Sequence, residues 1–427
     1  MLDLRFILDN LDDVRQNMSE RNVRADVDAL VTLAERRKEL ILEVESVRKR
    51  QNEVAKSMKG KMEKEERQAL IAEGKALKGK AGELDGQLAD TEGQLAEIQI
   101  QIPNMSHPDV PRGPGEEDNK EIKTWGEMPS FDFSPKDHVD LSDALDLIDW
   151  DSGARVAGSK FYFLKNDAVM LELALIHYAL STLRSEGFVI HTTPDLARQD
   201  VIANIGFNPR GEESQIYSIE NTNLSLVATA EITLGGMYSD QILEESELPL
   251  LLGGLSHCFR TEAGAAGRAS RGLYRVHQFT KVEMFAFTTP AQSNETLEKF
   301  LGIEEKLFQG LGVPYRVVDC STGDLGAQAY RKYDVEAWMP GRGDGGKYGE
   351  VTSASNCTDY QARRLKARFR PEGGGKPVHV HTLNGTAIAT SRGIVAVLEN
   401  YQQADGSIVV PEVLRPWMGK EVIEPVG

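Results

Sequence analysis

The chain has 427 residues, of which 40% are hydrophobic and 27% are charged, and its formal net charge is −17. This composition is typical of a globular protein with a sizeable core and two or three domains. The acidic balance excludes a protein that coats nucleic acid over its whole surface, so any RNA contact must use a local basic region.

Cysteines and apolar runs narrow the class of protein further. The three cysteines, Cys258, Cys320 and Cys357, lie far apart and form no CxxC pair. This spacing excludes a cysteine-rich zinc module and a disulfide framework, and it favours a reducing cytoplasm. The sequence contains no run of about 18 apolar residues and no signal-peptide core. We therefore expect a cytoplasmic protein without a membrane span.

Residues 1–103 have the pattern of a long helical hairpin. Apolar residues recur with three-four spacing over residues 30–58 and again over residues 77–102. Sustained spacing of this kind predicts a coiled coil, and the segment around 60–66 can reverse the chain. Two helices of about 30 residues each would span roughly 45 Å. Pro103 ends the second helix. We predict that residues 1–103 form a domain of their own.

This predicted hairpin is locally basic. Between Leu30 and Lys80 the chain holds 14 Lys and Arg residues against 9 Asp and Glu residues, a net charge of +5. One interpretation is a solvated coiled-coil surface, and the other is a basic arm that binds an RNA backbone. The half of the hairpin near the tip contains Arg48, Lys49, Arg50, Lys56, Lys59, Lys61 and Lys64.

A turn-rich connector with three prolines follows residue 102, and we place a domain boundary there, so that residues 104–427 form the second domain. Within it, a strongly apolar helix is predicted over residues 168–186, followed by a strand that ends at Pro194.

Further on, residues 228–231 join an apolar strand to a helix. Thr229 suits a helix cap, although Glu231 stands one residue too early for a capping box.

Residues 259–285 predict a strand hairpin around a small glycine-rich loop that carries Arg268 and Arg271. Alternation would place Arg260 and Glu262 on one face of the first strand. The return strand would carry residues 275–283. Arginine forks bind phosphate oxygens, and an aromatic ring with an arginine can hold a base. From the residues alone, an ordinary strand pair with ion pairs remains the alternative.

The last third of the chain holds three further patterns. Residues 341–348 nearly match a phosphate-binding loop, but Tyr348 replaces the required hydroxyl residue and no helix is predicted to follow, so we reject that motif. Glu350 and Ser353 could offer oxygens to magnesium, or could simply belong to a strand end. Residues 379–381 predict strand histidines rather than a metal pair. Residues 382–402 predict a strand, then a turn, then a helix with Arg392 at its start, where a cation opposes the helix dipole.

The order Phe-Arg-x-Glu at 259–262, a small loop, and Arg-x-His-Gln-Phe-x-Lys-x-Glu at 275–283 resembles motif 2 of class II aminoacyl-tRNA synthetases, in the version of the seryl-tRNA synthetases. Residues 168–194 resemble motif 1 and residues 382–402 resemble motif 3. The resemblance covers nearly the whole chain. It implies an α+β fold, with the N-terminal helical hairpin joined to a catalytic domain built on an antiparallel sheet flanked by helices.

The resemblance also implies an activity and its site. Members of this family attach L-serine to tRNA(Ser) with ATP through a seryl-adenylate, and they also charge tRNA(Sec). The residues that match the family's serine-binding positions are Thr229, Ala230, Glu231, Glu283 and Thr386. Those that match its ATP-binding positions are Arg260, Thr261, Glu262, Val276, Phe279, Glu350, Val351, Thr352, Ser353 and Arg392. Glu350 and Ser353 match the positions that hold Mg²⁺ with ATP, and we expect no zinc.

In the family's pattern, Arg260 holds the α-phosphate, Arg392 the γ-phosphate, Phe279 the adenine ring and Glu262 the adenine edge. Both arginines therefore count as catalytic. The family forms homodimers through motif 1, and its helical hairpin reaches the long variable arm of the tRNA.

This chain departs from the family's pattern at three places. Thr386 replaces a serine, Ser391-Arg392-Gly393 replaces Gly-Arg-Thr, and residues 203–209 replace a Gly-Thr-Gly stretch. Two other functions stay open. One is a related ligase that loads an amino acid onto a carrier protein, and the other is a non-catalytic RNA-binding coiled-coil protein.

Overall fold

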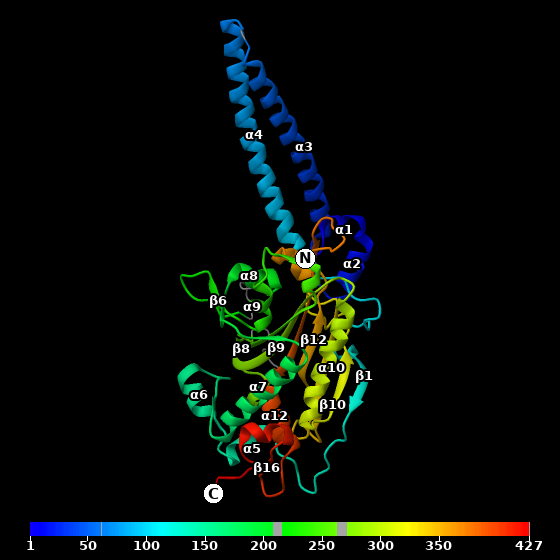
Figure 1. Cartoon of the computed structure of the whole chain (residues 1–427), viewed down its shortest axis with the longest axis vertical. Helices are drawn as coiled ribbons and strands as arrows, with labels where there is room; N and C mark the ends of the chain where they lie inside the picture. The colour runs from blue at the N-terminus through cyan, green and yellow to red at the C-terminus, as the bar shows by residue number, and fades with distance from the viewer. Residues whose placement is uncertain (61, 208–215, 263–270, 427) are drawn as a thin grey trace. The chain divides into compact units, whose positions relative to one another are not determined.

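The computed structural model describes residues 1–60, 62–207, 216–262 and 271–426. The chain divides into two compact units, Met1–Pro103 and Asn104–Gly427 (Figure 1). Each unit has its own hydrophobic core, so each is described by itself.

The first unit is helical. Its helices are α1 (Leu4–Asp9), α2 (Leu11–Glu20), α3 (Val27–Ser57) and α4 (Lys64–Gln99). Asp26 caps α3 by accepting a hydrogen bond from the Ala29 amide at 2.9 Å. The long helices α3 and α4 run side by side in opposite directions (Figure 1). Their contact is built from Leu40, Val44, Val47, Ala81 and Leu84. The predicted helical hairpin is confirmed.

Ion pairs between the two helices supplement this apolar seam. Arg37 lies 2.8 Å from Glu92, Arg48 lies 2.9 Å from Asp85, and Arg50 lies 2.7 Å from Glu73. All these side chains are substantially exposed, so each pair stabilises the hairpin by at most about 1 kcal/mol. Their main effect is to reduce the positive charge that the hairpin offers to a ligand, because Arg48 and Arg50 near the predicted tip already have acidic partners.

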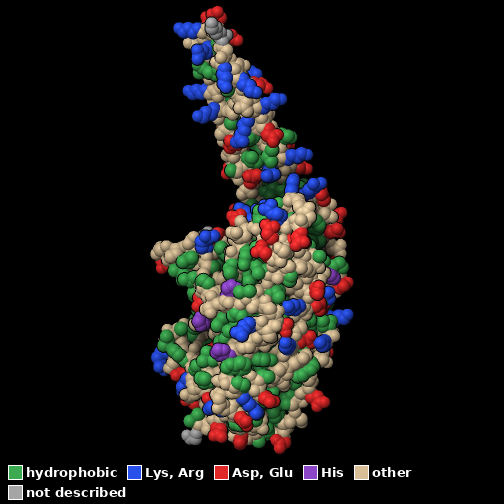
Figure 2. Space-filling view, in the orientation of Figure 1, with side chains coloured by type: hydrophobic (Ala, Val, Ile, Leu, Met, Phe, Trp, Pro, Cys, Tyr) green, Lys and Arg blue, Asp and Glu red, His purple; other side chains and the backbone are tan. Residues whose placement is uncertain are grey.

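The lysines near the tip differ from those arginines. Lys49, Lys56, Lys59 and Lys64 are exposed, and no carboxylate of the described residues is within ion-pair distance of them. Lys61 lies outside the described residues. Figure 2 shows the basic side chains gathered towards the end of the hairpin.

Glycines weaken α4 without a packing reason. A Cβ atom added at Gly79, Gly82, Gly86 or Gly93 would meet no atom within 4 Å. Gly86→Ala is therefore expected to stabilise α4 by about 1 kcal/mol, because alanine loses less backbone entropy in a helix. Amide hydrogen exchange along α4 measures this gain, and faster exchange in Gly86→Ala than in the wild type would contradict the expectation.

Gly153→Ala is expected to have the opposite effect. A Cβ atom added at Gly153 would lie 2.4 Å from the Phe161 carbonyl oxygen, so this substitution should destabilise the second unit.

The second unit is organised around one large sheet. Eight of the described strands form it, in the order β1-β10-β11-β12-β15-β9-β8-β4. Their bounds are β1 Lys120–Trp125, β4 Val189–Thr192, β8 Leu250–Phe259, β9 Gln278–Thr288, β10 Tyr315–Asp319, β11 Arg331–Met339, β12 Lys347–Asn356 and β15 His381–Ala389. Every neighbouring pair is antiparallel except β4 with β8.

Helices cover both faces of this sheet (Figure 1). Their bounds are α5 His138–Ala144, α6 Trp150–Ala157, α7 Asp167–Ser185, α8 Gln199–Ile205, α9 Ala230–Gly236, α10 Ser293–Leu311, α11 Tyr360–Leu365, α12 Thr390–Asn400 and α13 Arg415–Met418. Alternation along β9 separates two cores. Met284 packs with α7, α10 and α12, while Phe285 packs with α9 and α11. The predicted α+β fold with a largely antiparallel sheet is confirmed.

Short strands lie outside the large sheet. They are β2 Ile148–Asp149, β3 Phe163–Leu164, β5 Leu196–Arg198, β6 Leu224–Leu226, β7 Ile242–Glu244, β13 Arg368–Arg370, β14 Val378–His379, β16 Ile408–Val409 and β17 Val422–Ile423. Among the helices of the described residues, none combines the length and apolar character that a membrane span requires.

The structure corrects four local predictions. The strand β8 ends at Phe259, so Arg260 and Glu262 follow the strand instead of sharing one of its faces. Residues Gly272–Tyr274 form a 3-10 turn, and β9 begins only at Gln278. The turn arises because Gly272 has a φ of 76° and the Leu273 amide donates to His138 Nε2 at 3.1 Å.

The other two differences concern the C-terminal patterns. His379 and His381 lie on different strands, β14 and β15, so the rule of alternation does not apply to them. The predicted turn before Arg392 is absent, because α12 begins directly after β15. Arg268 lies outside the described residues.

Candidate active site

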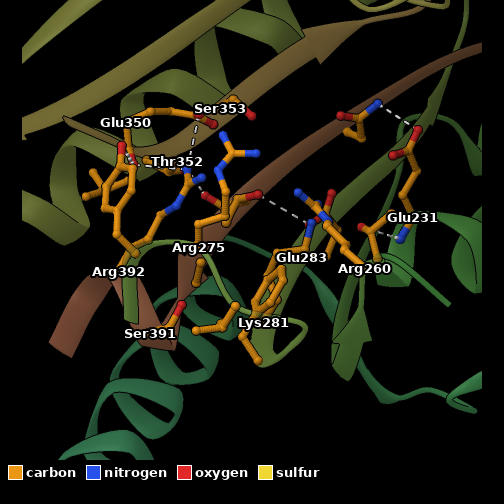
Figure 3. Close-up of a pocket in the computed structure, with 18 of the residues that line it drawn as sticks. Glu231, Arg260, Arg275, Lys281, Glu283, Glu350, Thr352, Ser353, Ser391 and Arg392 are labelled. Carbon is orange, nitrogen blue, oxygen red and sulfur yellow. Dashed lines mark hydrogen bonds and ion pairs between the residues drawn. The ribbon is translucent and has the colours of Figure 1, made fainter. Parts of the chain in front are cut away.

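A cavity of about 280 Å³ lies over the central strands of the large sheet. It is lined by Phe207, Thr229, Glu231, Arg260, Glu262, Tyr274, Arg275, Val276, Phe279, Lys281, Glu283, Glu350, Val351, Thr352, Ser353, Asn384, Thr386, Ala389, Ser391 and Arg392. The cavity thus brings together the residues selected from the sequence, except Ala230 and Thr261, which are not part of its lining. Figure 3 shows Glu350, Arg275 and Arg392 on one side of the view and Glu231, Lys281 and Glu283 on the other, with Arg260 beside Glu283. We call the acidic group the first and the arginines the second.

The first group begins at the N-terminus of α9. Thr229 is the N-cap of this helix, and its Oγ1 accepts a hydrogen bond from the Glu231 amide at 3.2 Å. The cap therefore fixes the start of the helix that carries Glu231. The Glu231 carboxylate is buried, and its Oε1 accepts hydrogen bonds from Gln361 Nε2 at 2.7 Å and from Asn384 Nδ2 at 3.0 Å.

Glu283 completes this group from β9. It pairs in register with Thr386 of β15, and Thr386 Oγ1 donates to Glu283 Oε2 at 3.5 Å. Lys281 lies two residues earlier on the same strand, so its side chain shares a face with Glu283. The Lys281 ammonium forms a buried ion pair with the Glu283 carboxylate.

The charge balance of the first group favours a cationic ligand. Burial, and then the charge of Glu283, raise the pKa of Glu231 to about 7. Burial also raises the pKa of Glu283, while Lys281 acts in the opposite direction. Two buried carboxyl groups therefore share one lysine, with the charge of Arg260 as a weaker influence on both. An ammonium group entering the cavity would stabilise the ionised form of both. A hydroxyl on the same ligand would meet Glu283 and Thr386.

The second group consists of arginines with aromatic and acidic neighbours. Arg392 lies in the first turn of α12, with its Nη1 3.2 Å from Glu350 Oε2 and its guanidinium 4.8 Å from the centre of the Tyr274 ring. Arg275 is 2.7 Å from Glu262. The Arg260 guanidinium lies 5.3 Å from the centre of the Phe279 ring, and its Nε donates to the Ala228 carbonyl oxygen at 3.4 Å. Three guanidinium groups and a ring in one cavity suit a nucleotide with several phosphates.

A β-bulge positions the candidate magnesium ligands. The register between β11 and β12 shifts between the pairs Val335–Thr352 and Glu336–Glu350, which leaves Val351 without a partner. In a regular strand, Glu350 and Ser353 would point to opposite faces, but the extra residue brings both to the cavity. Burial opposes ionisation of Glu350, but the positive charges of Arg392 and Lys332 have the larger combined effect, so the pKa of Glu350 is lowered. An ionised carboxylate and a hydroxyl fit Mg²⁺, because this ion prefers oxygen ligands and usually takes only one or two of them from the protein.

The cavity also includes Arg275, which the sequence placed on the hairpin without a binding role, and residues that the sequence did not single out for binding, namely Phe207, Tyr274, Lys281, Asn384, Ala389 and Ser391. Alternation could have identified Lys281 from Glu283 and Asn384 from Thr386, because each pair is two residues apart on one strand. Tyr274 carried no such signal, because it belongs to the 3-10 turn.

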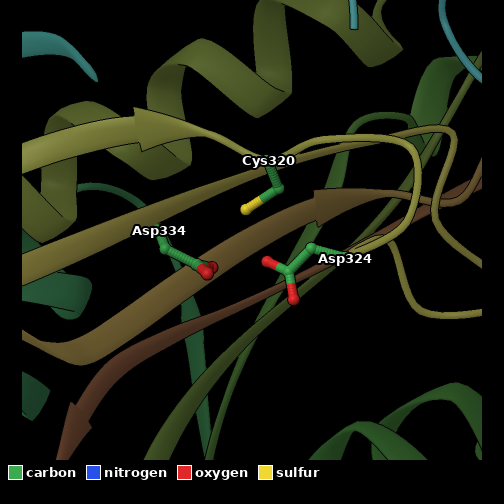
Figure 4. A group of neighbouring side chains, drawn as sticks. All are labelled: Cys320, Asp324 and Asp334. Carbon is green, nitrogen blue, oxygen red and sulfur yellow. The ribbon is translucent and has the colours of Figure 1, made fainter. Parts of the chain in front are cut away.

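A group of possible metal ligands lies next to this cavity. Atoms of Cys320, Asp324 and Asp334 that could bind a metal lie within 4.8 Å of one another (Figure 4). However, the Lys332 ammonium lies 3.4 Å from Asp324 and 3.2 Å from Asp334. This ammonium already supplies positive charge to both carboxylates, so the group serves as a partly buried ion-pair cluster.

Comparisons with known proteins agree on one family. A family model described as the tRNA synthetase class II core domain (G, H, P, S and T) matches residues 216–401. Another, described as the seryl-tRNA synthetase N-terminal domain, matches residues 1–106. The serine–tRNA ligase of Rubrobacter xylanophilus is 59% identical over 425 residues, which cover 100% of this chain and 99% of the relative. That of Treponema denticola is 55% identical over 419 residues, covering 98% of this chain and 99% of the relative.

Solved structures extend this agreement to three dimensions. The crystal structure of seryl-tRNA synthetase from Pyrococcus horikoshii complexed with ATP has a TM-score of 0.91 and 39% identity, and the match covers 100% of both chains. A prolyl-tRNA synthetase from Giardia lamblia, at 16% identity and a TM-score of 0.56, shares the fold over 65% of this chain and 55% of its own. The chain therefore belongs to the seryl-tRNA synthetase family of class II aminoacyl-tRNA synthetases.

Proposed function

We propose that this protein activates L-serine with ATP, forming seryl-adenylate and pyrophosphate, and then transfers serine to tRNA(Ser), with tRNA(Sec) as a second acceptor. The observation that supports this most is the division of one cavity into two groups. Glu231, Glu283 and Thr386 suit a small hydroxyl-bearing amino acid, and the arginines suit ATP. Both substrates would thus meet where the two groups adjoin.

Positioning and charge stabilisation account for the first step. The serine carboxylate attacks the α-phosphate of ATP, and pyrophosphate leaves. Arg260 holds the α-phosphate, Arg392 the γ-phosphate, Phe279 stacks on adenine and Glu262 accepts from its edge. Glu350 and Ser353 would hold Mg²⁺, which neutralises phosphate charge when it is bound. The step needs no general base, because the serine carboxylate is already ionised.

Serine recognition falls to the first group. Glu231 binds the serine ammonium, Thr229 lies beside it, and Ala230 completes the family's serine-binding segment. Glu283 and Thr386 bind its hydroxyl. Thr261, Val276, Val351 and Thr352 complete the family's ATP-binding positions.

The two units have separate tasks in this proposal. Residues 1–103 bind the tRNA, and residues 104–427 activate serine and dimerise. Support for a homodimer comes from the outward face of α7, where Val169, Met170 and Leu173 are 40–45% exposed. Three buried cysteines without disulfides suit a cytoplasmic protein.

Substrate discrimination tests the proposal. Alanine should be activated about 10⁴-fold less efficiently than serine, as kcat/KM, because it leaves the buried Glu283 and Thr386 groups without their hydroxyl partner. Threonine should be rejected by its additional methyl group. The measurement is amino-acid-dependent exchange of labelled pyrophosphate into ATP. Comparable kcat/KM values for alanine and serine would contradict the assignment of this pocket.

A further inference from the structure

Gln361 is a fully buried residue of α11 that lies behind the serine end of the cavity. Its Nε2 donates to the Ile205 carbonyl oxygen at 2.9 Å and to Glu231 Oε1 at 2.7 Å. Its Oε1 accepts from Thr382 Oγ1 at 2.7 Å. The Ile205 carbonyl oxygen can only accept a hydrogen bond, and the same holds for Glu231 Oε1 when the carboxylate is ionised. The amide nitrogen of Gln361 must therefore face these two oxygens, which fixes the orientation of the amide. Every hydrogen of the side-chain amide is used.

The network occupies one oxygen of Glu231. Gln361 and Asn384 both donate to Oε1. Among the described residues, no group donates a hydrogen bond to Oε2. Glu231 is also part of the cavity lining. The carboxylate is thus held at one oxygen from behind, while the other stays available to a ligand.

Glu231 and Glu283 are stabilised in different ways. Glu283 has the Lys281 ammonium as a direct ion-pair partner. No lysine, arginine or histidine of the described residues forms an ion pair with Glu231, and its direct supports are two neutral amides. Neutral donors stabilise the ionised carboxylate without cancelling its charge. The charge of Glu231 therefore remains available to a cationic ligand.

Several charged groups around Glu231 set how readily it ionises. Burial and Glu283 raise its pKa to about 7, while the Gln361 hydrogen bond, Lys281 and Arg260 lower it. The thiol of Cys357 also lies nearby, 3.5 Å from Asn384 Nδ2. Since burial and Glu283 already oppose ionisation of Glu231, loss of one donor to its carboxylate further disfavours the charged form.

We propose that Gln361 is a positioning residue for amino-acid recognition, which keeps Glu231 ionised and turned so that Oε2 binds the ammonium group of serine. This inference rests on the proposed function and assigns Gln361 no contact with substrate.

The test compares Gln361→Met with a matched control, Gln402→Met, by pyrophosphate exchange from pH 6 to 9. Gln402 is 2% exposed and has the same bonding pattern, with Nε2 donating to the carbonyl oxygens of Lys136 and Glu399 and Oε1 accepting from the Lys136 amide. It does not line the cavity. Both variants lose a buried amide, but only one loses a donor to Glu231.

Gln361→Met should raise the serine KM at pH 7 by roughly 10- to 150-fold, the loss expected for a hydrogen bond to a charged group. The ATP KM should change less than about twofold. The acid limb of kcat/KM for serine should move to higher pH by about one to two units, because the donor favours the ionised form. Activity should then recover partly as pH rises.

A purely structural role predicts another result. Gln361→Met would then lose thermal stability as Gln402→Met does, and its acid limb would stay at the wild-type pH, which would overturn the inference. If Gln361→Met fails to fold, Thr382→Val replaces it, because that change frees Gln361 Oε1 and should move the limb in the same direction by less; an unmoved limb there would also overturn the inference. Absence of serine-dependent exchange in the wild type would instead reject the proposed function.

Discussion

Arg392→Ala is expected to slow serine-dependent pyrophosphate exchange by about 10²- to 10³-fold, the usual effect of removing one preorganised donor to transition-state charge. Arg392 is held before ATP arrives, because Glu350 and the Tyr274 ring fix its guanidinium at the start of α12. Little of its binding energy is then spent on ordering the side chain. Arg392→Lys should recover part of the activity, since it keeps the charge but loses the planar fork.

Arg316→Ala is the matched control for this prediction. Arg316 also pairs with a glutamate, Glu336, and lies over a tyrosine ring, 4.9 Å from the centre of Tyr348. It does not line the cavity. The control should keep most of the exchange activity. Near-normal exchange in Arg392→Ala, with the fold intact by circular dichroism, would contradict the phosphate-binding role.

Removal of positive charge from the helical hairpin should weaken the second step of the reaction, the transfer of serine to tRNA. Replacing Lys49, Lys56 and Lys59 by glutamine should raise the KM for tRNA, while pyrophosphate exchange stays unchanged. Each lost phosphate contact removes about 0.7–0.9 from the log–log slope of binding against salt. Deleting residues 31–98 should have the larger effect, with tRNA charging greatly weakened and exchange nearly intact.

The control for this prediction changes the same net charge elsewhere. Lys120, Lys366 and Lys376 are exposed residues of the second unit, and their replacement by glutamine should leave the salt slope close to wild type. A hairpin that only mediates protein contacts predicts an unchanged tRNA KM and an unchanged slope in the lysine variant. That result would end the RNA-binding interpretation.

The elements that the sequence predicted well are those with a regular repeat. Three-four spacing located both helices of the hairpin, because the apolar seam between α3 and α4 requires it. Alternation located β9, although the strand begins at Gln278 and not at residue 275. The pattern could not indicate that Arg48 and Arg50 have acidic partners, since Asp85 and Glu73 come from the other helix, and that pairing depends on the register of the two helices.

The site was predictable where one segment carries several of its residues. It was not predictable where irregular backbone or distant residues decide the geometry. The bulge at Val351 turns Glu350 and Ser353 to the same side, but a bulge depends on the pairing with β11. Gln361 meets Glu231 across 130 positions of sequence, and only the packing of α11 against α8 and β15 brings them together.

Transfer of labelled serine to purified tRNA, in the presence of ATP and magnesium, tests the proposed function most directly. We expect ATP-dependent esterification of serine to tRNA(Ser), with AMP and pyrophosphate as products and little labelling of tRNAs for other amino acids. Serine-dependent pyrophosphate exchange without any charged tRNA, and with label on a carrier protein, would contradict it in favour of a carrier-loading ligase. A protein that binds tRNA but shows neither exchange nor charging would contradict it in favour of a non-catalytic RNA-binding protein.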